Sequence, residues 1–204
     1  MPRISAERKQ DRLQSILDAA GRVFAAKGLQ AASMADVAQD AGVSDGLLYR
    51  YFENKRALVD QVLQEFYERL LARLEKEVAR HSRIEDQLGT LIQLHLKAFV
   101  EEPGLCRLFI SEVRVASNYP GSNIQALNRR YTRVLLRIVD GAAKKRQIKA
   151  GLDATLFRDL LFGGIEHLAW RHVNGGRRLN IESDANVIAG ILLDGVKNRS
   201  RTLG

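Results

Sequence analysis

The chain has 204 residues, 46% of them hydrophobic and 27% charged, and its formal net charge at pH 7 is +8. This length and composition indicate a globular protein with one large domain or two small ones. The single cysteine, Cys106, excludes an internal disulfide and indicates a reducing compartment. The sequence contains neither an apolar signal segment nor the roughly 18 uninterrupted apolar residues of a membrane span, so we expect a cytoplasmic protein without membrane contact.

The positive charge favours a polyanionic partner, but its distribution limits what it predicts. Residues 1–56 contain nine Lys or Arg and seven Asp or Glu, a net charge of +2. The remainder contains 23 and 17, a net charge of +6. Most of the excess charge therefore lies outside the first quarter of the chain.

Few residues interrupt helices. The prolines are Pro2, Pro103 and Pro120, and apolar residues recur mostly at three- and four-residue spacing. The sequence therefore predicts an all-α fold.

The first helix is predicted from near Arg8 to Lys27, with Gly28 as its C-cap. Its start is rich in cations that are able to reach phosphates or a neighbouring minor groove, although a solvated tail is the simpler interpretation. These cations are Arg3, Arg8, Lys9 and Arg12.

The next stretch, from Ser33 to Lys55, has the spacing of a helix-turn-helix followed at once by a third helix. Ser33 is a suitable N-cap, and Asp36 stands three residues later, where a capping-box acid is expected. Gly42 is able to end the first helix in the left-handed conformation, and Ser44 then caps the second. An ordinary helical hairpin is the alternative interpretation of a single glycine turn of this kind.

The outward side of the second helix carries polar groups and a glycine that permits close approach, as expected of a helix in a DNA major groove. Its members are Asp45, Gly46, Leu47, Tyr49 and Arg50. The run AGVSDGLLYRYFENKRAL, which contains them, resembles the DNA-binding signature of the TetR family of bacterial repressors.

The resemblance implies phosphate or base contacts for Ser44, Gly46, Tyr49, Tyr51 and Lys55. Leu47 departs from the family pattern, which commonly has Thr, and an apolar contact with a thymine methyl is expected there instead. Arg50 is the candidate for bidentate recognition of guanine, and a phosphate-facing charge is its alternative role.

The resemblance divides the chain into a DNA-binding domain, residues 1–55, and a ligand-binding and dimerisation domain, residues 56–204. A helix from Lys55 to about Arg80 joins them and is the expected transmission element. Further helices are predicted at residues 84–102, 105–115, 124–147, 153–172 and 184–198.

The last two helices carry more apolar residues than one face can bury. They either pack within their own chain or, as the resemblance implies, pair with their copies in a homodimer. A two-fold dimer reads a palindromic operator in double-stranded DNA, with half-sites about one helical turn apart. The expected interface residues are Gly164, Leu168, Ile188, Ile191 and Gly195.

Residues 84–172 supply apolar side chains for an elongated cavity, interrupted by polar groups that are able to hold an anionic or carbonyl head. The predicted effector-binding residues are His95, Phe99, Arg107, Phe109, Arg114, Asn118, His167 and Trp170. The runs LFISEVRVASN and KAGLDATLFRDLLFGGIEH are similar to the C-terminal domain of TetR-type repressors of fatty-acid degradation that respond to fatty acyl-CoA. The implied effector is a long-chain acyl-CoA, and a multidrug-type aromatic effector is the alternative.

The segment from Arg129 to Lys149 contains eight cations and a single acid, Asp140. They are able to meet the phosphates of a coenzyme A group, although a solvated helix face is the simpler interpretation.

Enzyme signatures are missing from the sequence. It contains no H-E-x-x-H, G-x-S-x-G, P-loop or glycine-rich nucleotide fingerprint. We therefore expect no catalytic residue, metal site or cofactor. A helical enzyme or ligand carrier with a fortuitous helix-turn-helix is the alternative from a different class.

Overall fold

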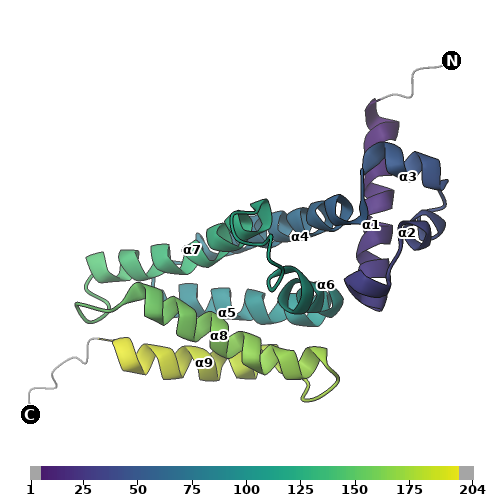
Figure 1. Ribbon diagram of the computed structural model, residues 1–204. Coiled ribbons are helices and arrows are strands. Elements are labelled where there is room, and N and C mark those ends of the chain that lie inside the picture. Colours follow the sequence, from purple (N-terminus) through teal and green to yellow (C-terminus); the bar gives the residue numbers. More distant parts are fainter. Residues whose placement is uncertain (1–5, 198–204) are drawn as a thin grey trace, which may run out of the picture. The chain divides into compact units, whose positions relative to one another are not determined.

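The computed structural model describes residues 6–197, and the predicted cation Arg3 lies outside them. The described chain consists of helices and loops, with one isolated bridge between Ile148 and Lys197 (Figure 1). This confirms the all-α prediction. The elements are α1 (Ala6–Ala31), α2 (Met34–Asp40), α3 (Asp45–Tyr51), α4 (Lys55–Val78), α5 (Ile84–Glu101), α6 (Pro103–Leu108), the π-helix η1 (Phe109–Val113), α7 (Asn123–Lys144), α8 (Ala154–Val173) and α9 (Ile181–Val196).

The predicted capping residues begin the helices as expected. The Ser33 hydroxyl accepts a hydrogen bond from the Asp36 N–H at 3.1 Å, and the Asp36 carboxylate accepts one from the Ser33 N–H at 2.9 Å, which completes the capping box of α2. Ser44 caps α3, and Asn54 accepts from the Ala57 N–H at 2.9 Å at the start of α4.

Several helix boundaries differ from the prediction. Helix α1 continues for three residues past Gly28, but Gly28 itself is not helical, with φ 75° and ψ 170°. The predicted helix 105–115 becomes α6 followed by the π-helix η1. Helix α9 begins at Ile181 because Asn180 caps it, accepting from the Ser183 N–H at 3.0 Å.

The chain forms two compact units, and these divide it differently from the predicted boundary at residues 55 and 56. Residues 1–68 and 103–127 make the first unit, and residues 69–102 and 128–204 make the second. The difference arises because α6 packs against α1, which brings a segment of the predicted ligand domain into the unit of the DNA-binding helices.

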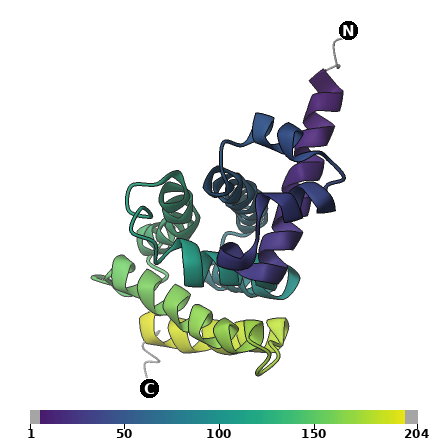
Figure 2. The same ribbon diagram turned by 45° about the vertical axis from the view of Figure 1, so that its right-hand side comes forward.

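In the first unit, α2 and α6 both pack against α1, and α3 packs against α2 (Figure 2). Its core is made of fully buried aliphatic and aromatic side chains. They include Ile16, Phe24, Val37, Leu48 and Leu58.

In the second unit, α8 and α9 lie beside α5 (Figure 1). The core side chains between them include Leu88, Leu91, Leu96, Ile165 and Leu193. Within the described residues, no helix combines the length and the hydropathy required to cross a membrane.

Candidate nucleic-acid interface

Helix α3, the second helix of the helix-turn-helix, is held by the turn that precedes it. Gly42 has φ 65°, the left-handed conformation that favours glycine, and the Val43 N–H donates to the Ala38 carbonyl at 2.9 Å. Leu48 is completely buried on the inner side of α3. Because one side of a short helix is fixed inward, the opposite side must face solvent.

The predicted DNA-contacting residues differ in exposure. Tyr49 is 54% exposed, although large aromatic side chains are usually buried. The Ser44 hydroxyl accepts from the Leu47 N–H at 3.3 Å, which leaves its own proton available for a phosphate oxygen. The exposed members are Ser44, Asp45, Gly46, Tyr49 and Arg50, and the half-buried members are Leu47, Tyr51 and Lys55.

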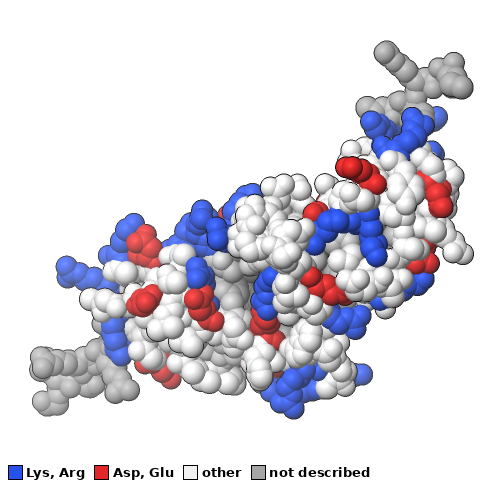
Figure 3. All heavy atoms as spheres, viewed as in Figure 1, with Lys and Arg blue, Asp and Glu red and all other residues white. Residues whose placement is uncertain are grey.

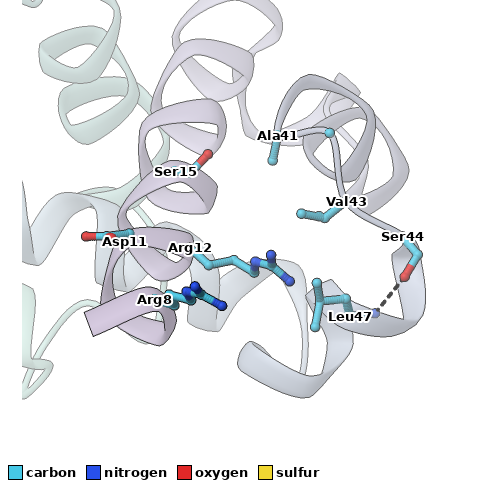
Figure 4. A pocket seen from close by; sticks show the side chains of 9 residues that line it. Arg8, Asp11, Arg12, Ser15, Ala41, Val43, Ser44 and Leu47 are labelled. Carbon is cyan, nitrogen blue, oxygen red and sulfur yellow. Dashed lines mark hydrogen bonds between the residues drawn. The ribbon is translucent and has the colours of Figure 1, made fainter. Parts of the chain in front are cut away.

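A first hollow of about 590 Å³ separates the start of α1 from the turn and the start of α3. Figure 4 shows the Arg8 and Arg12 side chains pointing from α1 into this space, toward Leu47, whereas the Asp11 carboxylate points away. Ser44 lies on the opposite wall. The first hollow therefore presents guanidinium groups on one side and a hydroxyl on the other.

A second hollow of about 840 Å³ also has Leu47 in its lining. Lys9 and Arg12 of α1 and Arg50 of α3 line it together with apolar and amide side chains, and no Asp or Glu is among these lining residues. Arg12 and Leu47 line both hollows. Three cations from two helices therefore converge on one carboxylate-free surface.

Lys55 has a role that the sequence did not predict. Its ammonium donates to the Leu29 carbonyl at 2.6 Å and to the Ala32 carbonyl at 2.8 Å, with a longer contact of 3.5 Å to the Gln30 carbonyl. Carbonyls at the end of a helix have no partner within the helix, so a lysine there satisfies them. This arrangement differs from the predicted phosphate contact, because the donors of Lys55 already point at the end of α1.

Two more side chains hold the same end of α1. The Arg107 guanidinium donates to the Ala25 carbonyl at 2.8 Å, and the Glu112 carboxylate accepts from the Leu29 N–H at 2.9 Å. In an uninterrupted α-helix, the N–H of residue 29 would donate to the carbonyl of residue 25. Arg107 and Glu112 therefore bond the two groups that would pair with each other if α1 did not turn at Gly28.

Surface ion pairs accompany this end of the helix. Arg22 lies 2.7 Å from Asp40, and Lys27 lies 2.7 Å from Asp36. The hydrogen bond from Lys27, together with those from the backbone and hydroxyl of Ser33, lowers the pKa of Asp36 to about 2. The cations at this end of α1 thus have anionic partners within the protein.

In the second unit, the predicted effector residue His95 lies among aromatic rings. Its Nδ1 is 3.1 Å from the Tyr131 hydroxyl, and its ring centroid is 4.9 Å from that of Phe162 and 5.4 Å from that of Phe99. Burial lowers the pKa of His95 to about 4, so the ring is neutral at pH 7. The structure brings His95 and Phe99 together and adds Tyr131 and Phe162, which the sequence analysis did not select.

Tyr131 was missed because it lies in a segment with arginines at positions 129, 130 and 133, although it shares an apolar stripe of α7 with Val134 and Ile138. That three- and four-residue spacing is the signal that identifies it as an inward residue.

The other predicted effector residues are more dispersed. In the first unit, the Arg114 guanidinium lies 6.0 Å from the centre of the Phe109 ring, Arg107 bonds α1, and Asn118 is exposed. In the second unit, His167 and Trp170 are exposed on α8. Six of the eight therefore stand outside the aromatic cluster of His95 and Phe99.

Some of the cations between Arg129 and Lys149 are bonded to other groups of the second unit. Arg137 lies 2.6 Å from Glu75, and Lys144 lies 2.7 Å from Asp140. The Lys145 ammonium donates to the Ser82 carbonyl at 3.1 Å. These contacts favour the interpretation of this series as a solvated helix face.

Helices α8 and α9 present apolar side chains to solvent in the single chain. Leu160 is 60% exposed and Ile191 is 70% exposed, whereas Leu168 and Ile188 are half-buried. A methyl group added at Gly164 or Gly195 would meet no atom of the chain within 4 Å. The positions predicted for a dimer interface are thus partly uncovered within the chain.

The fold and this surface define a helix-turn-helix DNA-binding protein, and comparisons with known proteins identify its family. The profile of bacterial regulatory proteins of the tetR family matches residues 16–62, and that of the C-terminal region of YsiA-like proteins matches residues 63–195. The chain belongs to the TetR family of transcriptional regulators and has a YsiA-like C-terminal region. The two relatives described below are transcriptional regulators and not enzymes.

Similar proteins cover almost the whole chain. The fatty acid metabolism regulator protein of Bacillus subtilis (strain 168) is 24% identical over 95% of this chain and 100% of its own length. The HTH-type transcriptional repressor KstR2 of Rhodococcus jostii (strain RHA1) is 24% identical over 92% of each chain. The structure of the transcriptional regulator FadR from Bacillus subtilis in complex with stearoyl-CoA has a TM-score of 0.82 at 24% identity, over 90% of this chain and 98% of that chain, which shows the common fold.

Proposed function

We propose that the protein is a homodimeric repressor that binds a palindromic operator through α3 and acts in the cytoplasm, where bacterial DNA lies. The observation that carries the proposal is the outward face of α3, on which Tyr49 and Arg50 are exposed while Leu48 fixes the helix from below. A recognition helix of seven residues reads few base pairs, so a two-fold pair of such helices is required for specificity.

The apolar faces of α8 and α9 support the dimer. Leu156, Leu160, Val187 and Ile191 are each more than half exposed in the single chain. Exposed apolar side chains on two neighbouring helices are typical of an interface. The open glycines Gly164 and Gly195 fit the same role, since they permit close approach of a helix from a second copy.

Substitution of a glycine tests the interface without disturbing the chain. Gly164→Leu is expected to give monomers in light scattering and to abolish operator binding, because a leucine separates helices that pack closely. The matched control is Gly89→Leu on α5, where an added methyl also meets no atom within 4 Å, and it should remain dimeric. An unchanged dimer for Gly164→Leu would remove this glycine from the interface.

We further propose that a long-chain acyl-CoA is the effector and that its binding releases DNA. The support comes from a relative of the same fold that was solved in complex with stearoyl-CoA, and from the neutral His95–Tyr131 pair among aromatic rings. A neutral polar pair in apolar surroundings suits a carbonyl group and not a cation. The remaining predicted contacts, with Arg114 as the head-group or phosphate partner, stay predictions.

A DNA-release titration tests the effector. Acyl-CoAs of several chain lengths, the matching free fatty acids and planar aromatic cations are added to the protein bound to its operator. Release by acyl-CoA, with a dependence on chain length, is the expected result. Release by the aromatic cations and by no acyl-CoA would favour the multidrug-type effector.

A further inference from the structure

We propose that Lys9 and Arg12 of α1 bind phosphates of the DNA backbone beside the half-site, so that the described start of α1 belongs to the DNA interface. This inference rests on the DNA-binding function and adds a contact surface to it. It concerns the two hollows that share Leu47 in their linings, to which α1 and α3 both contribute within the first unit.

Helix α1 carries two kinds of cation, those that are paired with a carboxylate and those that are not. Arg22 and Lys27 have carboxylate partners at 2.7 Å. Among the residues that the structure describes, Arg12 has no hydrogen-bond or ion-pair partner. A guanidinium that is not paired with a carboxylate is available for an external anion, and its planar fork matches a phosphate group.

The position of Arg12 favours an extended polyanion over a small ion. Arg12 lines both hollows, with Arg8 beside it in the first, and Lys9 and Arg50 beside it in the second. Figure 3 shows Lys and Arg side chains gathered at the described start of α1. Duplex DNA places a phosphate about every 1.7 Å along its axis, so a row of cations across two hollows fits its backbone.

The arrangement also assigns different tasks to the two helices. Lys9 and Arg12 belong to α1, whereas the side chains that face outward for base recognition belong to α3. Phosphate contacts fix register and orientation without reading sequence. Contacts from α1 therefore orient α3 and strengthen binding to all sequences alike.

The salt dependence of DNA binding tests this proposal. The probe is a duplex selected by the wild-type protein from a random library, with an unselected duplex of the same length beside it. In Arg12→Ala and Lys9→Ala, the slope of log affinity against log salt should become shallower by about 0.9 for each lost contact. Sequence discrimination between the two duplexes should remain unchanged, and Arg12→Lys should restore most of the slope.

Arg22→Ala is the matched control, because it removes one exposed arginine from the same helix that is paired with Asp40. It should leave the salt slope unchanged. Unchanged slopes in both Arg12→Ala and Lys9→Ala, with folding verified by circular dichroism, would overturn the proposal, as would a change in base preference. Because slopes are also measured on the unselected duplex, a failure to select any sequence would contradict the proposed operator and not the phosphate contacts.

A second observation carries an independent inference about the other end of α1. We infer that Arg107 and Glu112 are positioning residues for DNA binding, because they bond the two backbone groups that Gly28 separates. Their segment, α6 and η1, also approaches α1 through Gly104, where a methyl group would come within 2.3 Å of the Ala25 side chain. A movement of α6 and η1 would therefore displace α1, against which α2 also packs.

The positioning role is tested by measuring both the DNA affinity and its salt slope in variants of these two residues. Glu112→Ala and Arg107→Met should weaken binding to the selected duplex by a factor between about 5 and 150, the usual range of coupling between separate sites. The salt slope should stay at its wild-type value, because no phosphate contact is lost. Faster amide exchange at Leu29 in Glu112→Ala should accompany the loss.

Arg73→Ala, which breaks an exposed ion pair with Glu101 in the second unit, is the control and should bind DNA like the wild type. Wild-type affinity in both Glu112→Ala and Arg107→Met would overturn the positioning role. A shallower salt slope would overturn it as well, because it would make these residues phosphate contacts.

Discussion

The two ends of α1 carry similar cations in opposite situations. At the start, Lys9 and Arg12 line a carboxylate-free hollow together with Arg50. At the end, Arg22 and Lys27 are paired with acids, while side chains from α4, α6 and η1 bond the backbone around Gly28. The difference teaches that the role of a basic residue in this protein follows from whether the fold provides it with an internal acceptor.

The largest expected effect concerns the contact between α6 and the end of α1. Gly104→Val should lower the free energy of unfolding by about 3 kcal/mol, because a Cβ there would lie 2.8 Å from the Ala25 Cα, which belongs to the backbone. Gly21→Ala is the control on α1, since its Cβ would meet only Val62, at 3.8 Å. It should be neutral or stabilising by up to about 1 kcal/mol in urea unfolding.

The next effect distinguishes a structural lysine from a phosphate contact. Lys55→Met should lower the free energy of unfolding by about 1 to 3 kcal/mol, because it leaves the Leu29 and Ala32 carbonyls without this donor. Urea unfolding and the salt slope of DNA binding are measured on the same variant. A shallower slope by about one with unchanged stability would instead support the phosphate contact predicted from the sequence.

Arg50 marks the border between the hollow and the base-reading face. Arg50→Ala should reduce discrimination at one base position by about 1 to 3 kcal/mol, as expected for a lost guanine contact. Binding to a set of duplexes with single base changes measures this. If sequence preference survives and only the salt slope falls, Arg50 belongs with Lys9 and Arg12 as a phosphate contact.

The smallest expected effect is an acid sensitivity near the end of α1, where Lys27 pairs with Asp36. The folded-state pKa of Asp36 is about 2, below its ordinary value of 3.8, so the stabilisation by its hydrogen bonds is fully present above pH 3.8. It should be lost as the pH falls from 3.8 toward 2. Acid unfolding followed by circular dichroism should therefore show a weaker dependence on pH across this window in Asp36→Asn than in the wild type.

Sequence determined the local structure of this protein. Ser33, Asp36, Gly42 and Ser44 specify the helix-turn-helix because each acts within three or four residues, through a cap or a left-handed turn. The same short range explains the caps that Asn54 and Asp153 provide at the starts of α4 and α8. Family membership followed from this motif because its residues are contiguous.

Tertiary structure alone decided what the long polar side chains do. Lys55 bonds carbonyls 23 to 26 residues away, and Arg107 and Glu112 bond groups more than 80 residues away. Helical periodicity does not indicate contacts between residues so far apart in the sequence. The sequence analysis therefore predicted a phosphate contact for Lys55 and an effector contact for Arg107. That no acid pairs with Arg12 among the described residues, although Asp11 precedes it in sequence, is likewise a property of the folded surface. An exposed cation binds the acceptor that the packing of other helices places within its reach. The residues next to that cation in the sequence do not determine this packing.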